Sequence, residues 1–500
     1  MPEPHALYAV LLGLLSCALL LSPLVGSTAS RVAFIALIAS AGAGLMGGLQ
    51  GTWLALSIPV AGHEAALGFG ILVDRLSLLL VTFVAALGLV VYGYADRYLL
   101  GEAGRARFLG GIALVVGAAA IQALSPGLAQ FALAWVVMSV GIHRSLLHDP
   151  QRQAARRVAG VKFAVSRVAD VAMAGAIVAL LVGTGTTAFG AAPVAGPALL
   201  ITCLCLVIAT VCKMALVPGQ QWLIGTIEAP TPLSALMHAG AINAAGFLLV
   251  RCGGWFAAAP VAGDVLLLAG LVSAVVGPLA MWCQSDIKRS LAWSTVGQMG
   301  FTVVQIALGA PSAAILHLLG HGCYKANAFL RSGTVAAVVE ARPVPHAAGL
   351  ALLAWAGGSL TAFAVLSGTY TVLVDNPGQL PGGWALVAVQ ALALSQILAS
   401  PTSATFTWPL RLLVLLPVAL LYAVLVWAVE QLLAGVLPPL PTAPTHLAWA
   451  APIVLGVLGA FWAVMPSLAG GPFLRALRIH AANGFYLHLL LSRSPARNVP

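Results

Sequence analysis

Charged residues are scarce in this sequence. Asp, Glu, Lys and Arg together make up 7% of its 500 residues, hydrophobic residues make up 61%, and the mean hydropathy is +1.02. A soluble domain carries about 25% charged residues, so this composition argues against a soluble globular protein. It predicts an all-α membrane protein that crosses the bilayer many times.

Cysteine and an N-terminal basic region are also nearly lacking. The seven Cys lie in or beside apolar segments without a CxxC pair, so neither a disulfide framework nor a zinc ribbon is indicated. No basic residue precedes the first apolar stretch, in MPEPHALYAVLLGLLSCALLLSPLVG, and that stretch is long enough to span a bilayer. We therefore expect a first transmembrane helix there and not a cleaved signal peptide.

Apolar runs of spanning length recur along the whole chain and predict about 14 to 15 transmembrane helices. We place them near 6–25, 32–49, 71–93, 108–124, 128–142, 164–183, 197–216, 231–250, 264–283, 290–308, 312–336, 347–373, 384–400, 411–434 and 447–468. No linker separates two folding units. Residues 1–470 are thus expected to form one helical bundle, and 471–500 an interfacial or cytoplasmic segment that suits a partner contact.

The net charge of +10 could suggest nucleic acid, but the basic residues alternate between loops. Odd-numbered loops hold most of them, for example Arg31, Arg97 and Arg105, whereas Arg251 is the main exception in an even loop. The positive-inside rule explains this pattern as topology. It predicts a protein of the bacterial inner membrane whose N-terminus is periplasmic.

One face of the helix predicted near 312–336 is titratable. His317, His321 and Lys325 are spaced by four and eight residues, so their side chains fall within about 80° of helical arc. A charge at mid-membrane costs about 2.5–3.5 kcal/mol on insertion scales, and ionisable residues in such segments are usually functional. A buried Lys, unlike Arg, can release its proton, so the pattern favours proton relay.

Other interpretations of these side chains remain open. Lys213, the second Lys in an apolar run, could extend to the membrane surface, and Lys325 could pair with a carboxylate for packing alone. The two histidines could simply hydrogen-bond a neighbouring helix. HLLGH shares only its spacing with the metalloprotease HExxH, because Leu318 occupies the position of the Glu base, so a metal site is disfavoured.

A break in a helix is predicted after Lys213. Pro218 and Gly219 should interrupt it near membrane depth, where a break is tolerated if the backbone lines a polar cavity. Pro230 and Pro232 should then open a new helix carrying His238. An ordinary loop followed by a helix-starting Pro is the alternative.

Residues 160–171, GVKFAVSRVADV, bring three charges within reach of one another on a helix. Lys162 and Arg167 both lie near Asp170 in helical spacing. We expect Asp170 to be a buried counter-charge. A purely structural ion pair with Arg167 is as compatible with the spacing as a role in conduction.

These segments resemble a known superfamily. The runs APTPLSALMHAG, DIKRSLAWSTVGQMGF and HLLGHGCYKANAFLRSG are similar to the antiporter-like, proton-conducting subunits of respiratory complex I and Mrp antiporters. The resemblance implies two inverted five-helix repeats with broken helices, in an antiporter-like core over about 70–400. It also implies a relay with Asp170 and Arg167 as counter-charges. The implied relay residues are Lys213, His238, Lys288, His317, His321 and Lys325.

Two departures from that superfamily are visible. Val136 follows Trp135 where the complex I subunits have a Glu that partners the first lysine. Residues 360–375, LTAFAVLSGTYTVLVD, lack the charge expected at a second broken helix before Asp375. A complete complex I pump is therefore not expected.

The segment AWVVMSVGIHRSLL, the chain length and the ending NGFYLHLLLSR are instead similar to DabB-type subunits of inorganic carbon accumulation complexes. That resemblance implies a transporter subunit and no enzyme, coupled to H⁺ or Na⁺ and paired with a large DabA-type partner that resembles a zinc carbonic anhydrase. Zinc is then expected in the partner and no cofactor in this chain. The alternative is a proton-translocating subunit of a complex I-like oxidoreductase, a hydrogenase or an Mrp-type antiporter.

Overall fold

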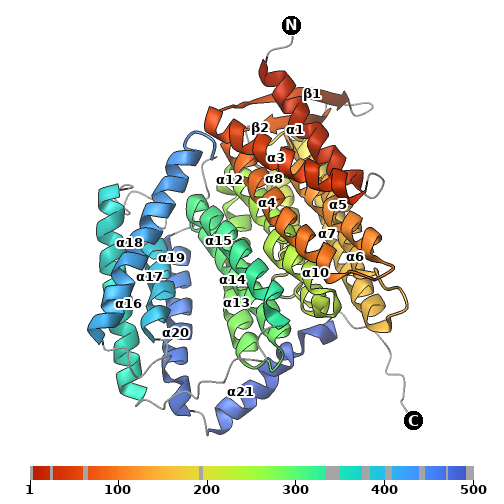
Figure 1. Ribbon diagram of the computed structural model, residues 1–500. Helices are drawn as coiled ribbons and strands as arrows, with labels where there is room; N and C mark the ends of the chain where they lie inside the picture. The colour runs from red at the N-terminus through yellow and green to blue at the C-terminus, as the bar shows by residue number, and fades with distance from the viewer. Residues whose placement is uncertain are drawn as a thin grey trace.

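The structure is a computed structural model that describes residues 4–22, 26–59, 66–190, 195–333, 348–373, 383–399, 408–437, 445–468 and 471–490. Helix dominates it, as predicted, and each apolar run named above coincides with helical residues (Figure 1). The α-helices are α1 (Pro4–Leu20), α3 (Ser27–Gly47), α4 (Arg75–Tyr98), α5 (Arg105–Ala123), α6 (Leu128–Leu146), α7 (Gln153–Thr184), α8 (Pro197–Lys213), α9 (Gln221–Gly225), α10 (Thr231–Leu236), α11 (Asn243–Arg251), α12 (Gly253–Ala257), α13 (Pro260–Trp282), α14 (Ile287–Ala307), α15 (Pro311–Leu330), α16 (Ala348–Leu373), α17 (Gly383–Ala399), α18 (Trp408–Leu433), α19 (Thr445–Ala448), α20 (Ala450–Val464) and α21 (Pro472–Ala482).

The protein is a multi-pass membrane protein. Among the described residues, eight helical stretches are long and apolar enough to cross a bilayer. These are Ser27–Gly47, Arg75–Tyr98, Arg105–Ala123, Gln153–Thr184, Thr231–Arg251, Pro260–Trp282, Ala351–Val372 and Leu413–Leu433. Shorter apolar helices cover His5–Leu20, Pro197–Lys213, Gly383–Ser395 and Ala450–Val464. The total of 14 to 15 spans remains a prediction.

The helices follow one another across the molecule in chain order. Helices α1 to α8 form one side, α10 to α15 the centre, and α16 to α20 the other side, while α21 lies beneath the central helices (Figure 1). Helix α16 is continuous over 348–373, so the second break that the resemblance implies is not found there. Asp375 lies outside the described residues.

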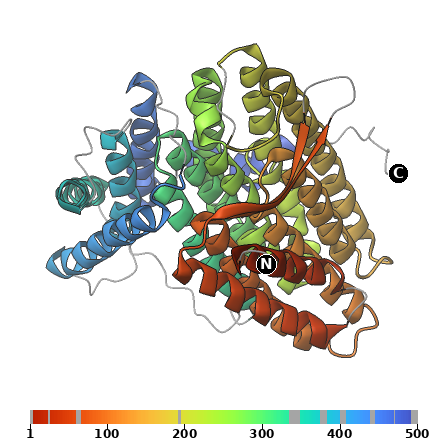
Figure 2. The same ribbon diagram turned by 90° about the horizontal axis from the view of Figure 1, so that it is seen from above.

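A β-hairpin that the sequence analysis did not predict lies across one end of the bundle (Figure 2). Strands β1 (Gly51–Pro59) and β2 (Ala66–Val73) are antiparallel, with Gly51 opposite Val73 and Pro59 opposite Ala66. The side chain of Gln130 on α6 forms two hydrogen bonds with the backbone of β2. Its amide donates to Gly70 O at 2.9 Å, and its oxygen accepts from Gly70 N at 2.8 Å.

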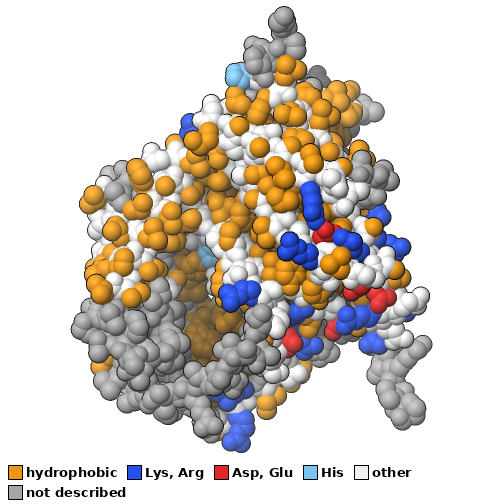
Figure 3. Space-filling view, viewed as in Figure 1, with side chains coloured by type: hydrophobic (Ala, Val, Ile, Leu, Met, Phe, Trp, Pro, Cys, Tyr) orange, Lys and Arg blue, Asp and Glu red, His pale blue; other side chains and the backbone are white. Residues whose placement is uncertain are grey.

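Ion pairs tie together the helix ends that the charge pattern placed on one side. Asp96, at the end of α4, pairs with Arg31 at the start of α3 and with Arg105 at the start of α5. On the face shown in Figure 3, the Lys and Arg side chains gather mainly away from the hairpin. Arg251, the exception in the sequence, is buried against Asp74 at 2.5 Å. Its position therefore reflects a buried ion pair and not loop topology.

Helices α13 and α14 approach so closely that only Gly fits between them. A Cβ added at Gly300 would lie 2.5 Å from Ala274 N and 2.6 Å from Gly270 O, both backbone atoms. Backbone cannot move aside as a flexible side chain can. This contact therefore fixes α14, which carries several groups of the candidate site below.

Gly300→Ala is expected to destabilise the folded protein by about 1–3 kcal/mol, since overpacking a close contact forces backbone shifts. Gly320→Ala on α15 is the matched control, because nothing lies within 4 Å of an added Cβ there. The control should be neutral or slightly stabilising, since Ala favours helix over Gly. Thermal unfolding midpoints in detergent measure both; equal midpoints would show that the α13–α14 contact is not tight.

Candidate functional site

The helix break predicted after Lys213 is present. Lys213 is the last residue of α8, and Pro218 and Gly219 lie in the turn before α9. A Cβ at Gly219 would lie 2.6 Å from Val211 O, so the turn requires Gly. Pro230 then caps α10, and Pro232 lies in its first turn. The break leaves Lys213 at a helix end inside the bundle.

Lys213 is held by a carboxylate and an aromatic ring. Its Nζ lies 3.4 Å from Asp170 Oδ1 and 5.1 Å from the ring centroid of Trp135, and the side chain is 11% exposed. It therefore does not extend to the surface. Asp170 also pairs with Arg167, its neighbour three residues earlier on α7. One carboxylate thus pairs with two cations, so Asp170 is a counter-charge for Lys213 as well as for Arg167.

Lys162 is a buried cation that the sequence analysis did not include in the relay. Its side chain lies inside the bundle and donates to Ser139 O at 2.5 Å and to Ser139 Oγ at 2.6 Å. Within the described residues no carboxylate lies in ion-pair distance of Lys162, although the charges of Lys213 and Asp170 act on it. The sequence contains only four Lys, and a Lys in such an apolar chain was the feature by which Lys162 could have been recognised as a candidate.

Lys325 lies at the centre of a second polar cluster. It is fully buried on α15, and its Nζ donates to Leu291 O of α14 at 2.9 Å. No ion pair with an acid is found for it in the described part of the chain, so the structure does not support the alternative of a structural carboxylate partner. A buried ammonium without a counter-charge makes the charged state costly, as a site that exchanges protons requires.

The two histidines of α15 precede Lys325 at intervals of about one helical turn. The rings of His317 and His321 are 6.1 Å apart between centroids, and both nitrogens of buried His321 lack a hydrogen-bond partner among the described residues. The charge of Lys325 acts on His321. Unpaired buried polar atoms are costly, and they are found at functional sites.

His238 joins this second cluster from another helix. It lies in a π-helical turn, Met237–Ala241, between α10 and α11, a local irregularity frequent at functional sites. Its Nδ1 lies 3.0 Å from Thr295 Oγ1 of α14, and its ring stacks on Phe329 at 4.4 Å. Its Nε2 has no partner in the described structure, and the charge of Lys325 acts on the ring.

Lys288 lies apart from these two clusters. It occupies the first turn of α14, half-buried, one turn before Leu291, whose carbonyl accepts from Lys325. The charges of Asp286, Arg152 and Glu228 act on it, and the last two form an ion pair at 2.8 Å. Lys288 therefore lies between the buried cluster and charges at the end of the bundle.

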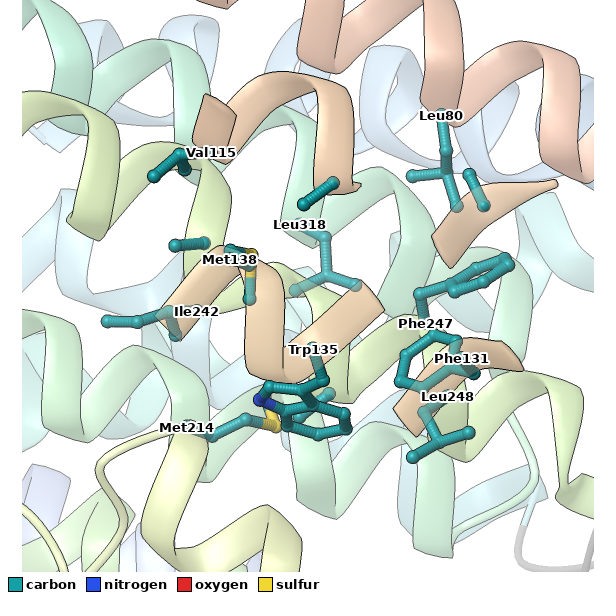
Figure 4. Packing of buried hydrophobic residues seen from close by; sticks show 14 of the residues in the cluster. Leu80, Val115, Phe131, Trp135, Met138, Met214, Ile242, Phe247, Leu248 and Leu318 are labelled. Atoms are coloured by element: carbon teal, nitrogen blue, oxygen red, sulfur yellow. The ribbon is translucent and has the colours of Figure 1, made fainter. Parts of the chain in front are cut away.

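Apolar side chains pack where α11 meets the residue after Lys213 and helix α15. Figure 4 shows Met214 beside Trp135, with Leu318 and Ile242 packed near them. Met214 and Leu318 both lie against Gly246, where an added Cβ would be 3.5 Å from Met214 Cε and 3.0 Å from Leu318 Cδ1. Met214, the neighbour of Lys213, and Leu318 of α15 thus share one apolar packing site.

The described residues place titratable lysine and histidine side chains in two buried groups. No set of three or more His, Cys, Asp or Glu in this part of the chain could hold a metal ion. Lysine and histidine nitrogens in hydrogen-bond or near-contact range can pass a proton along, with carboxylate and water as intermediates. The arrangement therefore suits transport of H⁺, with Asp170 also able to meet a small cation.

Two family models match this chain. The NADH:quinone oxidoreductase/Mrp antiporter transmembrane model matches residues 125–357, and the model of the complex I chain 5 N-terminus matches residues 60–109. Together they cover more than half of the chain. The chain belongs to the superfamily of antiporter-like membrane subunits that these two models describe.

Among its relatives, the probable inorganic carbon transporter subunit DabB2 of Halothiobacillus neapolitanus is 34% identical over 66% of this chain and 62% of that protein. Subunit L of NADH-quinone oxidoreductase from Escherichia coli is 35% identical over 57% of this chain and 47% of that protein. The chain thus matches less than two thirds of their lengths. A chain of the Mrp complex from Dietzia sp. DQ12-45-1b shares the fold, with a TM-score of 0.61 at 21% identity over 99% of this chain and 60% of that chain.

Asp170→Asn is expected to lower proton transport about tenfold or more. The change removes the carboxylate that Lys213 and Arg167 share, and a charged hydrogen bond contributes about 1.5–3 kcal/mol. Adding Val136→Glu to this variant should restore part of the activity, because residue 136 adjoins Trp135 and lies one turn before Ser139 on α6. Proton uptake into proteoliposomes, followed with a pH-sensitive dye, measures both.

Asp149→Asn is the control, since Asp149 is exposed and accepts only a local backbone hydrogen bond from Gln151 at 3.1 Å. This variant should transport like the wild type. If Asp170→Asn also transports normally, the ion pairs of Asp170 are structural only.

Proposed function

We propose that this chain is the ion-conducting subunit that energises uptake of dissolved inorganic carbon, bicarbonate or CO₂, in a bacterial inner membrane. The coupling ion is H⁺, with Na⁺ as the alternative. The N-terminus is periplasmic in this proposal, and a large zinc-containing partner similar to a carbonic anhydrase carries out the hydration chemistry. Similarity to subunits named as probable inorganic carbon transporters supports the substrate.

The observation that carries the ion-conducting part is the fully buried Lys325 without an acidic partner in the described structure. Its charge acts on the imidazoles of His321 and His238, which are groups able to accept and donate a proton. A purely structural cation would be expected to have a counter-charge, as Arg251 has in Asp74. Lys325 is therefore proposed as the central exchangeable site.

A second candidate function is proton translocation in a complex I-like oxidoreductase, supported by the similarity to the Escherichia coli subunit L. Position 136 argues against it. The resemblance to complex I places a Glu after the Trp, whereas this chain has Val136 and places Asp170 of α7 against Lys213 instead. Purification with quinone-reductase subunits, and without a carbonic-anhydrase-like chain, would favour this second function.

Lys325→Met is expected to abolish carbon uptake with little change in stability, because Met preserves most of the apolar volume and removes the titrating group. Lys325→Arg should fail nearly as completely, since Arg does not release its proton. His317→Gln and His321→Gln should give partial to severe loss. Uptake of labelled bicarbonate at several pH values, with membrane insertion checked by blotting, measures these effects. Wild-type uptake by Lys325→Arg would mean that Lys325 is a fixed charge.

Co-expression with the zinc-containing partner in a carbonic-anhydrase-deficient host tests the whole proposal. Growth in air should require both chains and should stop when a protonophore collapses the proton gradient. Growth that persists with the protonophore but fails when Na⁺ is replaced by K⁺ would assign Na⁺ as the coupling ion. Growth in air without this chain would refute the proposed function.

A further inference from the structure

A cavity of about 500 Å³ lies between the central helices and the last group of helices. Its walls come from α13, α14 and α15 on one side and from α17, α18 and α20 on the other. Figure 3 shows the molecule hollowed between these groups, with hydrophobic side chains in its depth. The volume falls in the range of about 300–1,000 Å³ found for ligand sites.

The cavity is mainly apolar and reaches the candidate relay. Its polar side chains, apart from two Trp, are Gln298, His317, Gln390 and Tyr422. No acidic residue is among the described residues that line it. Water fills a cavity stably only where several polar partners surround it, whereas an alkyl chain suits these walls better.

The rim of the cavity carries a cation at the end of a membrane-spanning helix. Trp282 is the last residue of α13, lines the cavity and meets Trp462 of α20 edge-on at 5.6 Å. The guanidinium of Arg478 on α21 lies 4.6 Å from the centroid of the Trp282 ring. Trp and Arg are the side chains that gather at the level of lipid headgroups.

Helix α21 has the features of a helix that lies at the membrane surface. It exposes Phe473 and Ile479 together with Arg475 and Arg478. Its C-terminal end is tied to the end of α13, because Gln284 donates to Ala482 O at 3.3 Å. A basic amphipathic helix of this kind binds the interface through apolar side chains and lipid phosphates.

The cavity also has the depth that a lipid chain requires. Ala274 and Trp282 both line it and are eight residues apart on α13, which corresponds to about 12 Å at 1.5 Å per residue. It therefore runs from a cationic rim into the apolar depth of the bundle. A phospholipid has the same polarity profile, with an anionic phosphate above an alkyl chain.

We propose that this cavity binds one acyl chain of a membrane phospholipid whose phosphate is held by Arg478. A chain in this position covers the side of His317 that faces the cavity and keeps bulk water from that end of the relay. The site is independent of the transported substrate, so it can be tested whether or not the chain carries inorganic carbon.

Native mass spectrometry of the purified, delipidated full-length chain with added phosphatidylglycerol tests the proposal. The wild type should retain one tightly bound lipid. Arg478→Gln should bind it at least tenfold more weakly, through loss of the charged contact. Ala393→Phe should also bind it at least tenfold more weakly, because Ala393 lines the cavity with an exposed side chain that Phe would extend into the space.

Arg475→Gln is the matched control, because it removes the same charge from the same helix, whereas it is the guanidinium of Arg478 that lies over Trp282 of the cavity wall. It should bind lipid like the wild type. Equal binding by Arg478→Gln and the wild type would overturn the headgroup assignment. Retention of lipid by a folded Ala393→Phe variant would overturn the chain assignment, and equal competition by an alkyl detergent would overturn the assignment of the occupant to a phospholipid. If Ala393→Phe does not fold, Ala393→Leu replaces it in the same measurement.

Discussion

The free energy needed to hold a charge inside an apolar bundle determines how this protein is organised. For two buried cations, an ion pair with a carboxylate offsets this free-energy cost. Arg251 pairs with Asp74, and Lys213 pairs with Asp170. Lys162 and Lys325 instead donate only to neutral oxygens, those of Ser139 and Leu291. A neutral oxygen stabilises an ammonium less than a carboxylate does, so the bundle contains two kinds of buried cation.

In the proposed function, this difference distinguishes the cations that keep their proton from the cations that exchange it. The Arg251–Asp74 pair is made by a side chain that does not lose its proton, and it joins α11 to the start of α4. The two lysines without carboxylate partners among the described residues, Lys162 and Lys325, lie on the continuous helices α7 and α15. The charge of Lys213, at the broken end of α8, acts on Lys162, and the charge of Lys325 acts on His238 in its π-helical turn. In the proposed function, a small set of buried charges therefore serves both the rigid parts of the fold and the ion pathway, in different positions.

The helices could be predicted from the sequence because long apolar runs allow little else in a membrane. The hairpin could not, since eight or nine apolar residues fit a strand or a helix equally well. The motifs placed Lys213, Asp170 and Lys325 in the site. They could not show that Lys162 meets Ser139, or that Arg251 meets Asp74 across 177 residues, because such contacts depend on packing. The cavity beside His317 likewise exists only after α17, α18 and α20 have packed.

The side chain of Gln130 connects helix α6 to the β-hairpin. Its side chain is bonded at both ends to Gly70 of the hairpin, and Ser139, which accepts from Lys162, lies nine residues later on the same helix. Nine residues correspond to about 14 Å of stiff helix. A protein that docks on the hairpin and shifts it would therefore displace the oxygen atoms around a buried proton-binding group. Helix α6 thus connects the hairpin at one end of the bundle to the polar contacts of Lys162 inside it.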